Sequence, residues 1–152
     1  IKLLELDKTI YNFIDSGKLF MGICLGLQLL FEKSEEFEVN QKGLGILKGS
    51  VKKFKFINND KLYPIPQIGW NKIMKNNEGW IDTPLEDNTN EDFMYFIHSF
   101  YVKPKSQKII LSTTKYGNKE YCSSISYENI FACQFHPEKS GDIGLNIYKN
   151  LK

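Results

Sequence analysis

The sequence predicts an α/β domain whose sheet carries an antiparallel insertion. Helical patterns stand near both ends of the chain, and several strand-like segments lie between them. A short apolar run also passes through Gly22-Ile23-Cys24-Leu25-Gly26 directly into a helical pattern, which is typical of a strand that turns into a helix. The length of 152 residues is that of one domain.

The N-terminal part is expected to form a helix, a strand and a second helix. Apolar residues that recur on one helical face predict the first helix, which ends before Gly17. The strand covers 18–23, the second helix covers 25–33, and a polar, glycine-containing loop follows over 34–45. The apolar face of the first helix consists of Leu3, Leu4, Leu6, Ile10, Phe13 and Ile14.

The remaining chain is expected to be mainly strands. A polar segment over 76–92, with Gly79 and Pro84, interrupts them as a loop. A closing helix over 140–151 has apolar residues at the spacing of one buried face, namely Ile143, Ile147 and Leu151. The strand-like segments are 51–56, 68–74, 93–97, 108–114, 121–126 and 130–135.

The composition argues against several classes of protein. Twenty basic and 18 acidic residues give a net charge of +2, which is no signature of nucleic-acid binding. Lys52-Lys53-Phe54-Lys55 is better interpreted as the solvated face of a strand. No apolar run reaches the length of about 20 residues that a membrane helix needs, and no signal peptide is visible.

The three cysteines favour a reducing cytosol. Cys24, Cys122 and Cys133 have no metal-ligand spacing, and any disulfide would leave one thiol over. Cys122 and Cys133 lie in strand-like segments and are expected to pack in the core. We therefore expect no metal and no cofactor.

Cys24 is the candidate nucleophile. Gly22 and Gly26 flank it in the thiol form of the nucleophile elbow, and we expect both to be required because a tight turn leaves no room for side chains. Backbone N–H groups at the start of the following helix are expected to lower the pKa of the thiol. A buried structural cysteine is the alternative, and this segment alone does not decide between the two.

His136 and Glu138 are the candidate base and its orienting acid. Pro137 restricts His136 to an extended backbone, and residues two positions apart in extended chain point to the same face. The carboxylate of Glu138 would then fix the imidazole tautomer and leave the other ring nitrogen free. Together with Cys24, these residues match the plan of nucleophile, base and orienter.

Separated motifs in this order resemble the class I (triad) glutamine amidotransferases. Within that family the chain is most similar to the glutaminase subunit of imidazole glycerol phosphate synthase. The resemblance covers nearly the whole chain and rests on Gly22-Ile23-Cys24-Leu25-Gly26, Leu27-Gln28-Leu29-Leu30-Phe31-Glu32, Ile68-Gly69-Trp70-Asn71, Tyr95-Phe96-Ile97-His98-Ser99-Phe100 and His136-Pro137-Glu138-Lys139-Ser140.

The resemblance implies a three-layer, flavodoxin-like fold with a mixed sheet and an active site at the carboxyl ends of the strands. It implies that the Cys24 thiolate attacks the side-chain amide of glutamine. His136 would protonate the leaving ammonia and then activate water, and Glu138 would orient His136. The backbone N–H of Leu25 would bind the oxyanion.

The resemblance also implies residues that bind glutamine. Gln28 would help to hold the substrate, with a solvated helix residue as the alternative. Ser99 and Phe100 would present backbone groups to it, although Phe100 stands where the family often has tyrosine. His98 is expected to be structural, because the triad already has a base.

The family passes ammonia to a (β/α)8-barrel cyclase in a heterodimer that serves histidine biosynthesis. Trp70, Asn71, Tyr95 and Lys139 match positions that face this partner; the alternative is a set of core aromatic residues and a solvated lysine. Two other functions remain open, namely ammonia supply for sugar modification in surface-polysaccharide synthesis and a non-catalytic interaction subunit.

The chain departs from the family at its start. It begins at Ile1, and no Pro-Gly-rich loop that would supply a second oxyanion donor precedes Cys24. The resemblance therefore implies an amidotransferase domain over 1–152 that is partial at its N-terminus.

Overall fold

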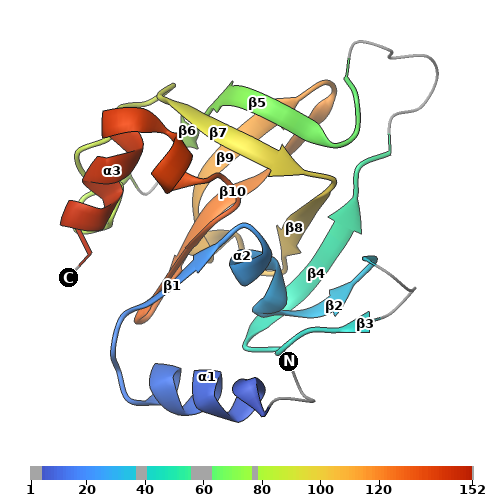
Figure 1. Cartoon of the computed structure of the whole chain (residues 1–152), viewed down its shortest axis with the longest axis vertical. Helices are drawn as coiled ribbons and strands as arrows, with labels where there is room; N and C mark the ends of the chain where they lie inside the picture. The colour runs from blue at the N-terminus through green and yellow to red at the C-terminus, as the bar shows by residue number, and fades with distance from the viewer. Residues whose placement is uncertain (1–4, 37–40, 56–62, 77–78, 152) are drawn as a thin grey trace.

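The computed structural model describes residues 5–36, 41–55, 63–76 and 79–151 (Figure 1). Its helices are α1 (Leu6–Asp15), α2 (Leu25–Leu29) and α3 (Gly141–Lys149), with 3-10 turns η2 (Gln107–Ile109) and η3 (Pro137–Lys139). Its strands are β1 (Phe20–Ile23), β2 (Phe31–Ser34), β3 (Gln41–Lys42), β4 (Leu47–Lys53), β5 (Gln67–Lys72), β6 (Met74–Lys75), β7 (Phe93–His98), β8 (Phe100–Pro104), β9 (Ile110–Tyr116), β10 (Lys119–Tyr127) and β11 (Ile130–Cys133).

The main sheet is mixed, which confirms the predicted α/β class. Its strands follow the order β1-β11-β10-β8-β4-β2-β3, and β9 adds β6 beside β10. The pairs β1–β11 and β2–β4 are parallel, whereas the other pairs are antiparallel. Strands β5 and β7 form a separate antiparallel pair.

Parallel pairing of β1 with β11 brings distant parts of the sequence together. Gly22 lies beside Ala132 and Ile23 beside Cys133, so both strands end at the same edge of the sheet. The Cys24 N–H continues the ladder and donates to the Cys133 carbonyl at 2.7 Å. Cys24 and the segment that follows Cys133 therefore begin side by side.

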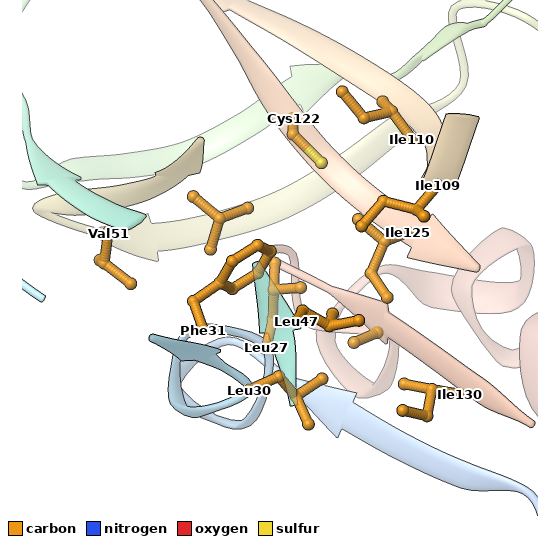
Figure 2. Packing of buried hydrophobic residues seen from close by; sticks show 12 residues of the cluster. Leu27, Leu30, Phe31, Leu47, Val51, Ile109, Ile110, Cys122, Ile125 and Ile130 are labelled. Atoms are coloured by element: carbon orange, nitrogen blue, oxygen red, sulfur yellow. The ribbon is translucent and has the colours of Figure 1, made fainter. Parts of the chain in front are cut away.

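Buried apolar residues anchor α2 against the sheet (Figure 2). Leu27, Leu30 and Phe31 have no exposed surface, and they belong to a cluster with Leu47 and Ile125. Burying a side chain of this kind contributes about 1.5–3 kcal/mol, so a few of them hold a short helix firmly. This cluster fixes the turn that carries Cys24.

The predicted helix over 25–33 is wrong in its second half. Helix α2 ends at Leu29, and Phe31–Ser34 forms β2, where Phe31 pairs with Leu47 of β4. The run Leu29-Leu30-Phe31 is apolar throughout, so it fits a buried helix end and a buried strand start equally well. Backbone pairing with β4 decides in favour of the strand.

Most other predicted elements are present with shifted ends, but β2, β3 and β8 were not predicted. In α3 the buried residues are Gly144 and Ile147, whereas Ile143 is 41% exposed, so its predicted burial is wrong. The described part of the loop over 76–92 has no helix or strand, yet Trp80 and Leu85 in it are buried. Leu3, Leu4 and Phe56 lie outside the described residues.

The N-terminal helix lies at the surface. Helix α1 has no buried residue, and Ile14 makes only a partly buried contact with the cluster around Leu27. In the described ranges, no helix has the length and apolar content that crossing a membrane requires. In the same ranges, no group of three or more His, Cys, Asp or Glu side chains is arranged to hold a metal ion.

Candidate active site

Cys24 stands at a strained turn between β1 and α2. Its backbone has φ 50° and ψ −100°, a combination that a non-glycine residue adopts at a cost of about 1–3 kcal/mol. A Cβ at Gly22 would lie 3.0 Å from the Gly26 carbonyl carbon and 3.1 Å from the Ala132 Cβ. Glycine is therefore needed at position 22. A Cβ at Gly26 would meet nothing within 4 Å among the described residues, so the expected steric need there is wrong.

The sulfur of Cys24 is half-buried between polar groups. Its Sγ accepts hydrogen bonds from the Leu25 N–H and from Gln134 Nε2 at 3.5 Å, and the thiol points at the Ile97 carbonyl at 3.9 Å. Burial raises the pKa of the Cys24 thiol more than these two donors lower it, and the carboxylates of Glu36 and Glu138 raise it further. The expected lowering of the pKa is therefore wrong.

His136 and Glu138 form the predicted pair. His136 follows β11 in extended conformation, and its Nδ1 lies 2.7 Å from Glu138 Oε1 in η3. A carboxylate accepts a hydrogen bond, so Nδ1 carries the proton. The Nε2 atom is buried and has no hydrogen-bond partner in the described part of the chain, so no such bond joins it to Cys24 Sγ.

Backbone bonds hold His136 in place. Its N–H donates to the Tyr95 carbonyl of β7 at 2.8 Å. The Ser140 hydroxyl donates to the His136 carbonyl at 2.6 Å and accepts from the Tyr95 N–H at 3.0 Å. The turn that carries both triad candidates is thereby tied to β7.

Gln28 is a buried residue, which excludes the solvated alternative. It is 7% exposed, and its Nε2 donates to the Phe100 carbonyl and to Gln134 Oε1, both at 3.1 Å. An amide nitrogen has two hydrogens, so both are used within the protein. Any contact of Gln28 with glutamine would have to be made by Oε1.

The carbonyls of Ser99 and Phe100 already have partners. The Ser99 carbonyl accepts from the Phe54 N–H at 3.0 Å. The Phe100 carbonyl accepts from His98 Nδ1 at 2.7 Å as well as from Gln28. Burial lowers the pKa of His98 to about 4, so its imidazole is neutral at physiological pH. His98 thus supports the chain at the Phe100 carbonyl, in line with a structural role.

The sequence reasoning missed Gln134. This side chain is fully buried, and its two amide ends contact Gln28 and Cys24. A signal was present, because Gln134 is a polar residue within the otherwise apolar segment that leads to His136. A buried amide in that place needs partners.

Three of the four residues matched to the partner lie together on β5, β7 and η3. Trp70 is 55% exposed and packs edge-on against Tyr95 with ring centroids 6.0 Å apart, and Lys139 Nζ lies 6.0 Å from the centre of the Tyr95 ring. Trp70 is therefore not a core residue. Asn71 differs, because its amide donates to the Lys115 carbonyl and accepts from the Lys72 N–H.

Trp70 and Tyr95 belong to a larger apolar surface. Alternate residues of the two strands point outward in register, Ile68 beside Ile97 and Trp70 beside Tyr95. Most of these side chains are exposed. We call this surface the β5–β7 face; it consists of Ile68, Trp70, Phe93, Tyr95 and Ile97.

Comparison with known proteins identifies the family. The family model for class-I glutamine amidotransferase matches residues 4–150. The imidazole glycerol phosphate synthase subunit HisH of Methanocaldococcus jannaschii is 48% identical over 152 residues, which are 98% of this chain and 70% of that protein. The HisH subunit of Pyrococcus furiosus is 43% identical, with 99% and 73% covered, and that of Aquifex aeolicus is 46% identical, with 98% and 67% covered.

Solved structures support the same fold at lower sequence identity. A glutamine amidotransferase from Thermotoga maritima matches 96% of this chain with a TM-score of 0.59 and 18% identity, and PurLQS from the same organism matches 96% with a TM-score of 0.61 and 20% identity. The chain spans 51% and 66% of those two chains. The protein therefore belongs to the class I glutamine amidotransferases and, within them, to the family of HisH subunits of imidazole glycerol phosphate synthase.

Proposed function

We propose that Cys24, His136 and Glu138 are the catalytic triad that hydrolyses glutamine to glutamate and ammonia. The observation that carries this proposal is the bond from His136 Nδ1 to Glu138 Oε1 at 2.7 Å, which leaves the buried Nε2 without a partner in the described residues. A buried ring nitrogen without a partner is costly unless a substrate or a proton uses it. This nitrogen belongs to His136, which follows β11, and β11 pairs with β1, the strand that leads to Cys24.

In the first half of the reaction, the Cys24 thiol gives its proton to Nε2 of His136, and the resulting thiolate attacks the side-chain amide carbon of glutamine. The carbonyl oxygen becomes an oxyanion, and the Leu25 N–H, which already points at the sulfur, is the donor placed to bind it. The C–N bond then breaks, and His136 Nε2–H gives its proton to the leaving nitrogen, which departs as ammonia. A γ-glutamyl thioester remains on Sγ.

In the second half, neutral His136 takes a proton from water at Nε2. The resulting hydroxide attacks the thioester carbon, the C–S bond breaks, and glutamate leaves. Glu138 stabilises the imidazolium in both halves because its carboxylate stays bonded to Nδ1. Gln28 is linked to the sulfur through Gln134 and to the Phe100 carbonyl, and we assign Gln28, Ser99 and Phe100 to the side of the site that binds glutamine.

We further propose that the β5–β7 face binds a cyclase subunit that consumes the ammonia in histidine biosynthesis. Exposed aromatic residues near a cationic side chain are characteristic of interface centres, and Trp70, Tyr95 and Lys139 supply them here. The site is one strand away, because the Tyr95 and Ile97 carbonyls of β7 contact His136 and Cys24. The three free cysteines favour the cytosol as the compartment.

The test is glutamate release from glutamine, measured with and without the cyclase subunit and its acceptor substrate. Cys24→Ala should abolish release, whereas Cys122→Ala, which removes a buried thiol from the core, should retain it. The cyclase should stimulate turnover of the unmodified protein. Equal glutamate release from Cys24→Ala and the unmodified protein would exclude Cys24 as the nucleophile.

A further inference from the structure

The fully buried Gln134 amide contacts the reacting sulfur, and the proposed steps leave it without a role. We propose that Gln134 is a catalytic residue whose amide N–H stabilises the Cys24 thiolate, and that Gln28 is the positioning residue that orients this amide. The inference deepens the proposed function, because it assumes that Cys24 acts as a thiolate. It rests on three hydrogen bonds that link the Phe100 carbonyl to Cys24 Sγ through the two glutamines.

The direction of these bonds follows from their anchored end. The Phe100 oxygen is a backbone carbonyl and accepts only, so Gln28 must turn its Nε2 toward it. The second hydrogen of the same Nε2 then donates to Gln134, which must present Oε1. The opposite end of the Gln134 amide is therefore Nε2, and this donor lies 3.5 Å from Cys24 Sγ. Neither amide can be flipped without placing two acceptors or two donors face to face.

A donor in this position favours the thiolate over the thiol. Burial disfavours a negative charge on the sulfur. The Ile97 carbonyl and the carboxylates of Glu36 and Glu138 disfavour it as well. The Leu25 N–H favours the thiolate, but it is also the donor that the oxyanion needs. Gln134 is then the donor that stays with the sulfur when the substrate engages Leu25. Buried charge-assisted bonds are also stronger than exposed ones.

A purely structural amide is the competing explanation, and the thiol itself distinguishes the two. The rate at which iodoacetamide alkylates Cys24 is followed by mass spectrometry across pH in the purified protein. This measurement needs no glutamine, so it stays informative if the glutaminase assay fails. If the alkylation of Cys24 responds to the variants as expected but no glutamate is released, the result counts against the proposed function alone.

The variants are chosen to preserve shape. Gln134→Met removes the donor without adding charge, and Gln134→Glu keeps the outline of the side chain while replacing the donor by an oxygen. Gln134→Met should raise the midpoint of Cys24 alkylation by about one pH unit and lower the rate near neutral pH about tenfold, as expected for loss of one bond to an ionised group. Gln134→Glu should raise the midpoint at least as much, because its carboxylate also repels the thiolate. Glutamine turnover should lose kcat rather than KM.

Two further variants serve as a test of the orienting residue and as a control. Gln28→Met leaves Gln134 in place but removes the group that orients it, so the midpoint should move in the same direction by a smaller amount. Gln67→Met makes the same replacement at a buried glutamine, bonded to Tyr121, that does not touch the sulfur, and it should leave the profile unchanged. Unaltered alkylation profiles in folded Gln134→Met, or in Gln28→Met where Gln134→Met does not fold, would overturn the proposal.

Discussion

Alanine at Gly22 should displace the nucleophile, whereas alanine at Gly26 should not. A Cβ added at Gly22 would lie 3.0 Å from the Gly26 carbonyl carbon, 3.1 Å from its oxygen and 3.1 Å from the Ala132 Cβ. Two of these neighbours are backbone atoms of the helix that follows Cys24. The elbow must therefore move by a few tenths of an ångström to relieve the contacts, and Cys24 moves with it.

The two substitutions should separate in both stability and activity. Overpacking of this kind costs about 1–3 kcal/mol. At Gly26 the added methyl meets nothing within 4 Å, and alanine in a helix is favoured over glycine by about 0.5–1 kcal/mol. Misplacing a nucleophile by up to about 1 Å costs up to about a hundredfold in turnover, so Gly22→Ala should lose roughly tenfold or more. Gly26→Ala should stay near the unmodified value.

Thermal unfolding and glutamate release, measured on both variants, check the prediction. A loss of about 1 kcal/mol lowers the melting temperature of a domain of this size by about 2–4 °C. Turnover should fall in Gly22→Ala even at temperatures where the variant is fully folded. Unchanged turnover in Gly22→Ala, or a larger loss in Gly26→Ala, would show that the contacts at the elbow are not what places the sulfur.

Three other predictions follow from the site. Glu138→Gln should lower kcat at least about a hundredfold with little change in KM, because the amide no longer stabilises the imidazolium of His136; steady-state kinetics tests this. Since burial raises the pKa of Cys24, its alkylation rate should climb about tenfold per pH unit through neutrality, and a plateau already at neutral pH would contradict the raised pKa. Trp70→Ala should weaken cyclase binding by about 2 kcal/mol or more in calorimetry, whereas Ile81→Ala, which is exposed but outside the β5–β7 face, should bind normally.

The sequence was sufficient for the triad candidates because each of them has a local pattern. An elbow glycine precedes Cys24, and Pro137 separates His136 from Glu138. The direction in which the pKa of Cys24 is shifted could not be predicted in the same way, because it depends on burial, and the groups around the sulfur include Ile97 and Gln134, which are distant in sequence. The helix start that suggested a lowered pKa is real, but α2 has only five residues. Desolvation therefore outweighs it.

The hydrogen bond between Gln28 and Gln134 could not be predicted from the sequence for a similar reason. Gln28 and Gln134 are separated by more than a hundred residues, and only the parallel pairing of β1 with β11 brings them together. The end of α2 was also undetermined, since the run that includes Phe31 is apolar in both interpretations. Local patterns thus indicated the candidate residues of the triad, whereas pairing between strands determined which residues contact them.

The edge of β7 that faces away from β5 explains why the candidate site lies where it does. One edge of β7 pairs with β5, and in an antiparallel strand the N–H and C=O of every second residue point to the opposite edge. At that opposite edge the Tyr95 N–H and C=O bond to Ser140 and His136, and the Ile97 carbonyl faces the Cys24 thiol. The segments that carry the triad candidates therefore satisfy backbone groups that another strand would otherwise pair, and an unpaired edge is costly to leave open. Side chains of the same residues point outward into the β5–β7 face. Because main-chain bonds leave no signature in side-chain patterns, only the fold reveals that one strand supports the site and forms this face.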